Sequence, residues 1–104
     1  MKLKFPKKVQ IGHHLFTVKY DKKEAGGSFS YENREIIIGT EHLEKDPSSV
    51  FGVIAHEVME IIHCMINTRY TDWGTMRDFK FFMTHKEFQT SMEIFTQTIQ
   101  NFIE

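Results

Sequence analysis

The chain has 104 residues, a formal net charge of −1 and 40% hydrophobic residues. This length and composition predict one packed domain spanning residues 1–104 and exclude a disordered chain. The nearly balanced charge argues against nucleic acid as a partner, because nucleic-acid-binding domains carry a clear excess of Lys and Arg.

The first forty residues predict β structure. Residues 9–11 and 15–20 read as two strands joined by a Gly-His-His turn, and residues 28–31 and 35–38 form a second hairpin. We therefore expect a small antiparallel β-meander of three to four strands. Residues 1–23 hold seven Lys against one acidic residue, and we interpret these Lys as solvated edge-strand residues rather than a nucleic-acid surface.

Two helices follow the strands. Asp46 and Pro47 are typical of a helix start, with Asp at the N-cap and Pro at the first helical position, and this helix should run to about residue 67. Thr84 and Glu87 have the spacing of a capping box. Apolar residues follow at helical spacing: Phe88, Met92, Phe95, Ile99 and Phe102. The predicted fold class is α+β, a β-meander followed by two packed helices.

The sequence also predicts a cellular compartment. The single cysteine, Cys64, excludes an internal disulfide and fits a reducing environment. The first twelve residues lack the apolar stretch of a signal peptide, and no apolar run reads as long enough to span a membrane. We therefore expect a cytoplasmic protein that does not bind membranes.

The first predicted helix carries an unusual set of polar residues. Residues 50–66 contain no Lys, Arg, Asp, Asn, Gln, Ser or Thr, and their polar side chains besides Cys64 are His56, Glu57, Glu60 and His63. A helix face that meets water usually carries Lys or Arg. Imidazoles and carboxylates on a buried helix need partners, and the simplest shared partner is a metal ion.

The spacing of these residues assigns them roles. His56 and Glu60, at i and i+4, can bind one zinc or another divalent ion. Glu57 then lies beside the metal without binding it, where a general base for a metal-bound water belongs. His63 lies about 10 Å along the axis from His56, so it would orient Glu60 or bind a second metal. Alternatively, Glu60 and His63 are simply hydrogen-bonded on a polar helix face.

A zinc site needs a third protein ligand. We expect His85, in the first turn of the second helix, because the apolar faces of the two helices should pack together. A neutral, metal-bound imidazole also suits a helix N-terminus better than a charged one. Glu87 is the alternative, although the capping box already uses its side chain.

His56-Glu57-Val58-Met59-Glu60, placed between a short β region and a second helix, resembles the HExxH-type motif of small zincin-like metallopeptidases found in phages and prophages. The resemblance implies a zinc peptidase in which Glu57 activates the zinc-bound water. A peptide substrate would then add as a strand along residues 35–39, with Tyr70 as a candidate oxyanion donor. This sequence departs from the family at Glu60, where the motif has its second histidine.

The alternative function is a catalytically inactive zincin fold that acts as a protein-interaction module. Two aromatic-rich segments, residues 70–73 and 79–82, would then form the docking surface. Core filling is the simpler interpretation of those aromatic residues. In both hypotheses the partner is a peptide or a protein.

Overall fold

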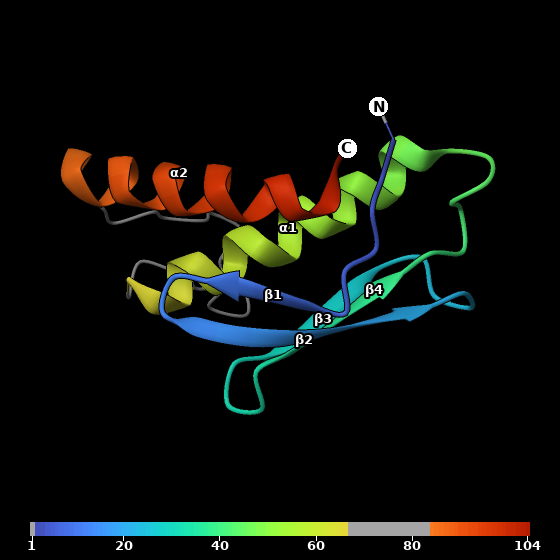
Figure 1. Ribbon diagram of the computed structural model, residues 1–104, viewed down its shortest axis with the longest axis horizontal. Coiled ribbons are helices and arrows are strands. Elements are labelled where there is room, and N and C mark those ends of the chain that lie inside the picture. Colours follow the sequence, from blue (N-terminus) through green and yellow to red (C-terminus); the bar gives the residue numbers. More distant parts are fainter. Residues whose placement is uncertain (1, 67–83) are drawn as a thin grey trace, which may run out of the picture.

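The computed structural model describes residues 2–66 and 84–104. Four strands come first in the chain (Figure 1): β1 (Lys8–Ile11), β2 (His14–Asp21), β3 (Gly27–Ser30) and β4 (Glu35–Gly39). Two α-helices and a short 3₁₀ helix follow: α1 (Pro47–Met65), α2 (His85–Ile99) and η1 (Gln100–Phe102). This order confirms the predicted α+β class.

The sheet is mixed, with the strand order β1-β2-β4-β3. Both predicted hairpins are present, but β2 and β4 run parallel, with Val18 opposite Ile36. The prediction of an all-antiparallel meander is therefore wrong at the junction between the hairpins. The chain leaves β2, forms the edge strand β3, and returns as β4 between β2 and β3. Alternating hydrophobicity reveals strands but not their neighbours, so the residue pattern could not reveal this insertion.

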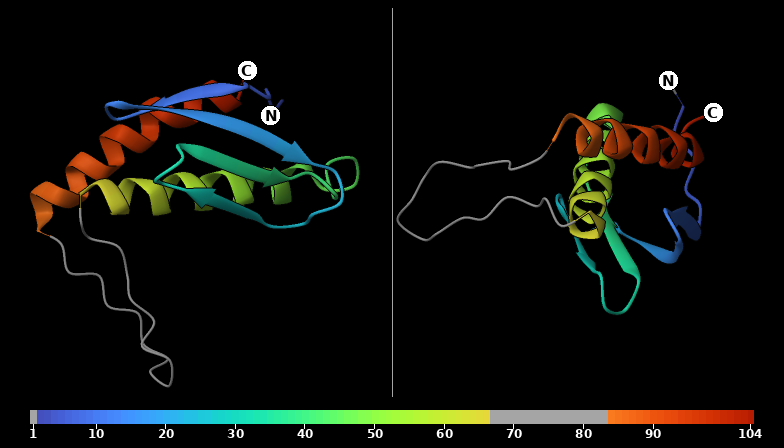
Figure 2. Two further views of the ribbon diagram at one scale, coloured as in Figure 1. Left: turned by 90° about the horizontal axis from the view of Figure 1, so that it is seen from below. Right: turned by 90° about the vertical axis from the view of Figure 1, so that its left-hand side faces the viewer.

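The fold has two layers, because both helices cover the same face of the sheet (Figure 2). α1 packs against β3 and β4, whereas α2 packs against α1 and β1. Apolar residues that alternate along the strands point towards the helices and form the core. The buried core residues are Val9, Ile11, Phe16, Val18, Ile36, Ile38, Val50, Ile54, Val58, Ile61, Ile62, Ile99 and Phe102.

Both helices begin where the sequence predicts. The Asp46 carboxylate accepts a hydrogen bond of 3.3 Å from the Ser49 N–H, which confirms the N-cap of α1. In α2 the Thr84 hydroxyl accepts from the Glu87 N–H, and the Glu87 carboxylate accepts from the Thr84 N–H at 2.8 Å. These side chains satisfy helix N–H groups that have no partner within the helix.

Only part of the predicted apolar face of α2 is buried. Ile99 and, beyond the end of α2, Phe102 reach the core, but Phe88 and Met92 are 52% and 39% exposed among the described residues. Helical spacing correctly identified the helix. It overestimated how far the buried stripe extends towards the N-terminus of α2.

α1 is long and apolar enough, by length and composition, to cross a membrane. The sequence analysis did not expect a run of this length. The core helix of a soluble protein meets the same criterion, and here one face of α1 packs on the sheet through Ile54, Val58 and Ile61. This packing is consistent with a soluble protein.

Candidate metal centre

Three side chains from the middle of α1 form a cluster: His56, Glu57 and Glu60. Each offers one ligand atom, and these atoms all lie within 4.8 Å of one another. His56 Nε2 lies 3.4 Å from Glu60 Oε2 and 3.8 Å from Glu57 Oε2. One helical turn separates His56 from Glu60, so both project from the same face of α1, as the sequence predicted.

The distance between His56 and Glu60 suits a shared metal ion. Ligand atoms about 2.0–2.2 Å from a tetrahedral zinc lie ~3.4 Å apart. The same distance also fits an ion pair between a protonated His56 and Glu60, and an exposed pair of that kind contributes little stability. The geometry therefore permits zinc binding by these two side chains, and a metal-free ion pair equally well.

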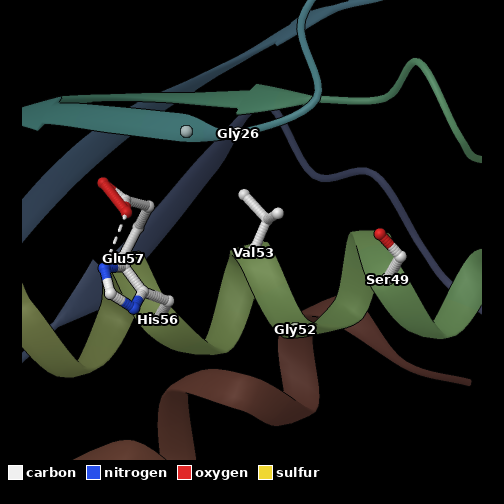
Figure 3. A pocket seen from close by; sticks show the side chains of 7 residues that line it. Gly26, Ser49, Gly52, Val53, His56 and Glu57 are labelled. Carbon is white, nitrogen blue, oxygen red and sulfur yellow. Dashed lines mark ion pairs between the residues drawn. The ribbon is translucent and has the colours of Figure 1, made fainter.

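The three side chains differ strongly in burial. The side chain of Glu57 is 5% exposed, whereas those of Glu60 and His56 are 28% and 61% exposed. Figure 3 shows Glu57 rising from α1 towards the start of β3. Burial raises the pKa of the Glu57 carboxyl, the negative charge of Glu60 raises it further, and His56 opposes both effects. A carboxylate with a raised pKa is a better proton acceptor than an exposed one.

The Glu57 side chain is 5% exposed, and its ion contact among the described residues is the His56 imidazole at 3.8 Å. Burying a carboxylate is unfavourable unless a cation or a hydrogen-bond donor accompanies it. Among the described residues no fully buried side-chain oxygen lacks a hydrogen-bond partner, so the burial of Glu57 does not by itself require a bound cation.

A pocket of about 410 Å³ opens between the start of β3 and α1, and Glu57 lies at one end of it (Figure 3). Its α1 wall is built from residues spaced by three and four, which share one helix face. The lining residues are Gly26, Gly27, Ser49, Gly52, Val53, His56 and Glu57. The pocket and the metal-capable cluster are therefore continuous.

The glycines that line the pocket are of two kinds. A Cβ on Gly27 would lie 2.8 Å from Val53 Cγ1 and 3.0 Å from Glu57 Cγ, so Gly27 allows β3 and α1 to approach closely. A Cβ on Gly52 or Gly26 would meet no atom within 4 Å, and neither residue has a positive φ. Glycine inside a helix costs roughly 0.5–1 kcal/mol relative to alanine, so Gly52 is unfavourable for α1.

The other predicted ligands lie apart from the cluster. His63 is buried on α1, and burial lowers the pKa of its imidazole, which favours the neutral ring. His85 is exposed in the first turn of α2. α2 begins at the end of the molecule where α1 ends (Figure 1), and Met65 at that end lies roughly 14 Å along the axis from His56. Glu87 serves the capping box.

The described residues therefore bring no α2 side chain to His56 and Glu60. A third ligand from α2 would require the first turn of α2 to lie beside the middle of α1. In the structure this turn lies beyond the C-terminal end of α1 (Figure 1). Tyr70 and the aromatic segments 70–73 and 79–82 lie outside the described residues.

The sequence analysis missed the pocket. It assigned no role to Gly26, Gly27 or Gly52. The available signal was Gly52 itself, because glycine is uncommon inside a helix that is otherwise rich in apolar residues.

Comparison with known proteins gave no match. No protein-family model, curated protein sequence or solved structure matches this chain. The resemblance to zincin-like peptidases therefore depends on residues 56–60 and the order of strands and helices. Any function must be argued from the site itself.

Proposed function

We propose that this protein is a zincin-like, divalent-metal-dependent peptidase in which His56 and Glu60 hold the ion and Glu57 accepts a proton. The observation that supports this proposal is the 3.4 Å separation of His56 Nε2 and Glu60 Oε2, which fits two ligands of one zinc. Zinc is the expected ion because catalytic zinc sites combine imidazole with carboxylate ligands. Among the described residues His56 and Glu60 supply two of the three protein ligands that such a site needs.

The chain supplies distinct groups for peptide hydrolysis. A bound zinc would polarise a peptide carbonyl and lower the pKa of a coordinated water. His56 offers an imidazole nitrogen from the exposed side of the cluster, and Glu60 offers a carboxylate one turn later. Glu57 follows His56 directly but is buried against β3. This burial makes Glu57 the best placed of the three to hold a proton during the reaction.

The free edge of β3 supports a peptide substrate. Among the described residues β3 is a terminal strand of the sheet, whereas β4, the strand expected to bind the substrate, is paired on both sides. The Gly39 N–H donates to the Gly26 carbonyl at 2.7 Å, so by antiparallel alternation the backbone groups of Gly27 and Phe29 point to the open edge. An extended peptide can add there as a further strand, beside the cluster.

We also propose a cytoplasmic location. Cys64 is a free, half-buried thiol. Free thiols persist in reducing compartments, and the cytoplasm is such a compartment. Alkylation of Cys64 by a membrane-permeable thiol reagent in intact cells would support this placement, and a mixed disulfide at Cys64 would contradict it.

Metal content tests the proposal directly. Native protein and His56→Ala should be purified without chelator or histidine tag and analysed by elemental mass spectrometry. We expect close to one zinc per native chain and its loss from His56→Ala. His42→Ala is the matched control, because His42 Nε2 lies 3.9 Å from a Glu41 carboxylate outside the cluster. Absence of zinc from native protein, even after zinc is offered, would overturn the metal site.

Activity separates an enzyme from a binding module. Zinc-loaded protein should cleave unfolded casein, and Glu57→Gln should retain zinc while losing cleavage by a factor of at least ~100. A zinc-loaded wild type that cleaves neither casein nor a random peptide mixture would contradict the peptidase and favour an inactive zincin-like interaction module.

A further inference from the structure

Two glycines face each other across the pocket without a structural reason to be glycine. Gly52 lies in the interior of α1, where alanine would favour the helix. Neither Gly52 nor Gly26 has a positive φ, and a Cβ on either would meet no atom within 4 Å. Both glycines are exposed and line the pocket, so a larger side chain at either would reduce its open space. Gly52 and Gly26 therefore keep the space beside the cluster open.

The pocket has the size and polarity of a ligand site. Its volume of about 410 Å³ falls within the usual range for small-ligand pockets. Val53 supplies an apolar surface and Ser49 a hydroxyl, and the described lining carries no Lys or Arg. The Glu57 side chain, which is 5% exposed, borders the same space. An acidic group in the pocket would be repelled by Glu57 and a basic group by an ion held at His56 and Glu60, whereas an uncharged group would meet neither repulsion.

The sheet geometry directs a side chain into this space. Side chains of a strand alternate between the two faces of a sheet. In a peptide paired with the free edge of β3, every second side chain would point to the helix-covered face, towards Gly52 and Val53. The peptide backbone would then lie in the plane of the sheet, next to β3.

We propose that this pocket is a specificity subsite that receives one large uncharged side chain, aromatic or branched aliphatic, from an extended peptide paired with β3. The inference rests on the proposed peptidase function, and it adds the class of side chain that the substrate carries. Gly52 and Gly26 are the specificity-determining residues, because the absence of a side chain at each position leaves the pocket open.

Titration with small peptide fragments tests the subsite without relying on activity. N-acetyl-phenylalanine amide, N-acetyl-glutamate amide and N-acetyl-glycine amide are added separately to ¹⁵N-labelled protein, with zinc and with a chelator. We expect saturable amide shifts at Gly26, Gly52 and Val53 for the phenylalanine fragment. Its dissociation constant should be at least ~10-fold lower than those of the other two fragments.

Substitutions assign the binding to the pocket. Gly52→Leu and Gly26→Leu fill it from opposite walls, and each should weaken the phenylalanine fragment at least ~10-fold while zinc content stays at the wild-type level. Gln97→Leu, which adds the same side chain to an exposed position of α2, should bind like the wild type. If Gly52→Leu does not fold, Gly26→Leu decides the outcome.

The outcomes for the pocket and for the metal are separate. Zinc binding without a saturable phenylalanine shift, or equal affinity for all three fragments, overturns the subsite and leaves the metal site standing. Phenylalanine binding that Gly52→Leu abolishes supports the subsite. If such binding occurs in a protein that takes up no zinc, the metal proposal fails and the pocket remains a site for uncharged side chains.

Discussion

α1 presents two faces with opposite character. One face is apolar, buried against the sheet, and consists of Val50, Ile54, Val58 and Ile61. The other borders the pocket and the cluster, and consists of Ser49, Gly52, Val53, His56 and Glu60. The first face stabilises the fold by burying apolar area. The second contains a glycine and metal-capable groups, and Glu57 lies where the two faces meet.

The largest effect on stability should come from the buried face. Ile54 is fully buried, and Ile54→Ala should lower the free energy of unfolding by about 2–5 kcal/mol through lost burial and a cavity. Urea denaturation followed by circular dichroism measures this change. The folded fraction should bind zinc with wild-type affinity, because Ile54 lies outside the cluster. A loss of zinc affinity above tenfold would show that the two faces are not independent.

The second largest effect on the free energy of unfolding should come from substitution of Glu57, and this substitution should stabilise the protein. Without metal, Glu57→Gln should raise the free energy of unfolding at neutral pH by about 1 kcal/mol, because it removes a buried charge. Thermal unfolding in the presence of a chelator measures this gain. Saturating zinc should make the wild type the more stable of the two proteins, because only the wild type keeps the anionic carboxylate beside the ion.

The pH dependence of this effect follows from the pKa of Glu57. Burial raises that pKa above its usual value of 4.5, so the folded state holds the proton over a pH range in which the unfolded chain has released it. The contribution of Glu57 to stability is therefore full below the unfolded pKa and is lost as pH rises through the folded pKa. Glu57→Gln should lack this loss. Parallel pH profiles for the two proteins would contradict the assignment.

Sequence predicted the elements whose signals are local. Caps at Asp46 and Thr84, two hairpins and the i, i+4 pair of His56 and Glu60 each depend on residues a few positions apart. The structure contains all of these features. They define the helix starts, the strands and the core of the candidate site.

Sequence did not predict features that depend on tertiary arrangement. The parallel pairing of β2 with β4 joins two hairpins that look alike in pattern, and the place of His85 depends on how α1 and α2 align. The pocket forms between the start of β3 and α1, which brings Gly26 and Gly52 into one lining. None of these depends on a residue spacing within one element, so hydrophobic periodicity carries no information about them.

The smallest predicted effect distinguishes the two kinds of glycine. Gly52→Ala should raise the free energy of unfolding by ~0.5–1 kcal/mol, because alanine favours the helix and its Cβ meets no atom within 4 Å. In a domain of this size the melting temperature should rise by about 2–5 °C, which calorimetry can resolve. Gly27→Ala is the matched control and should lower stability, because its Cβ would lie 2.8 Å from Val53 Cγ1. If both substitutions destabilise the protein, Gly52 serves the fold, and its presence in the pocket wall no longer supports a binding role.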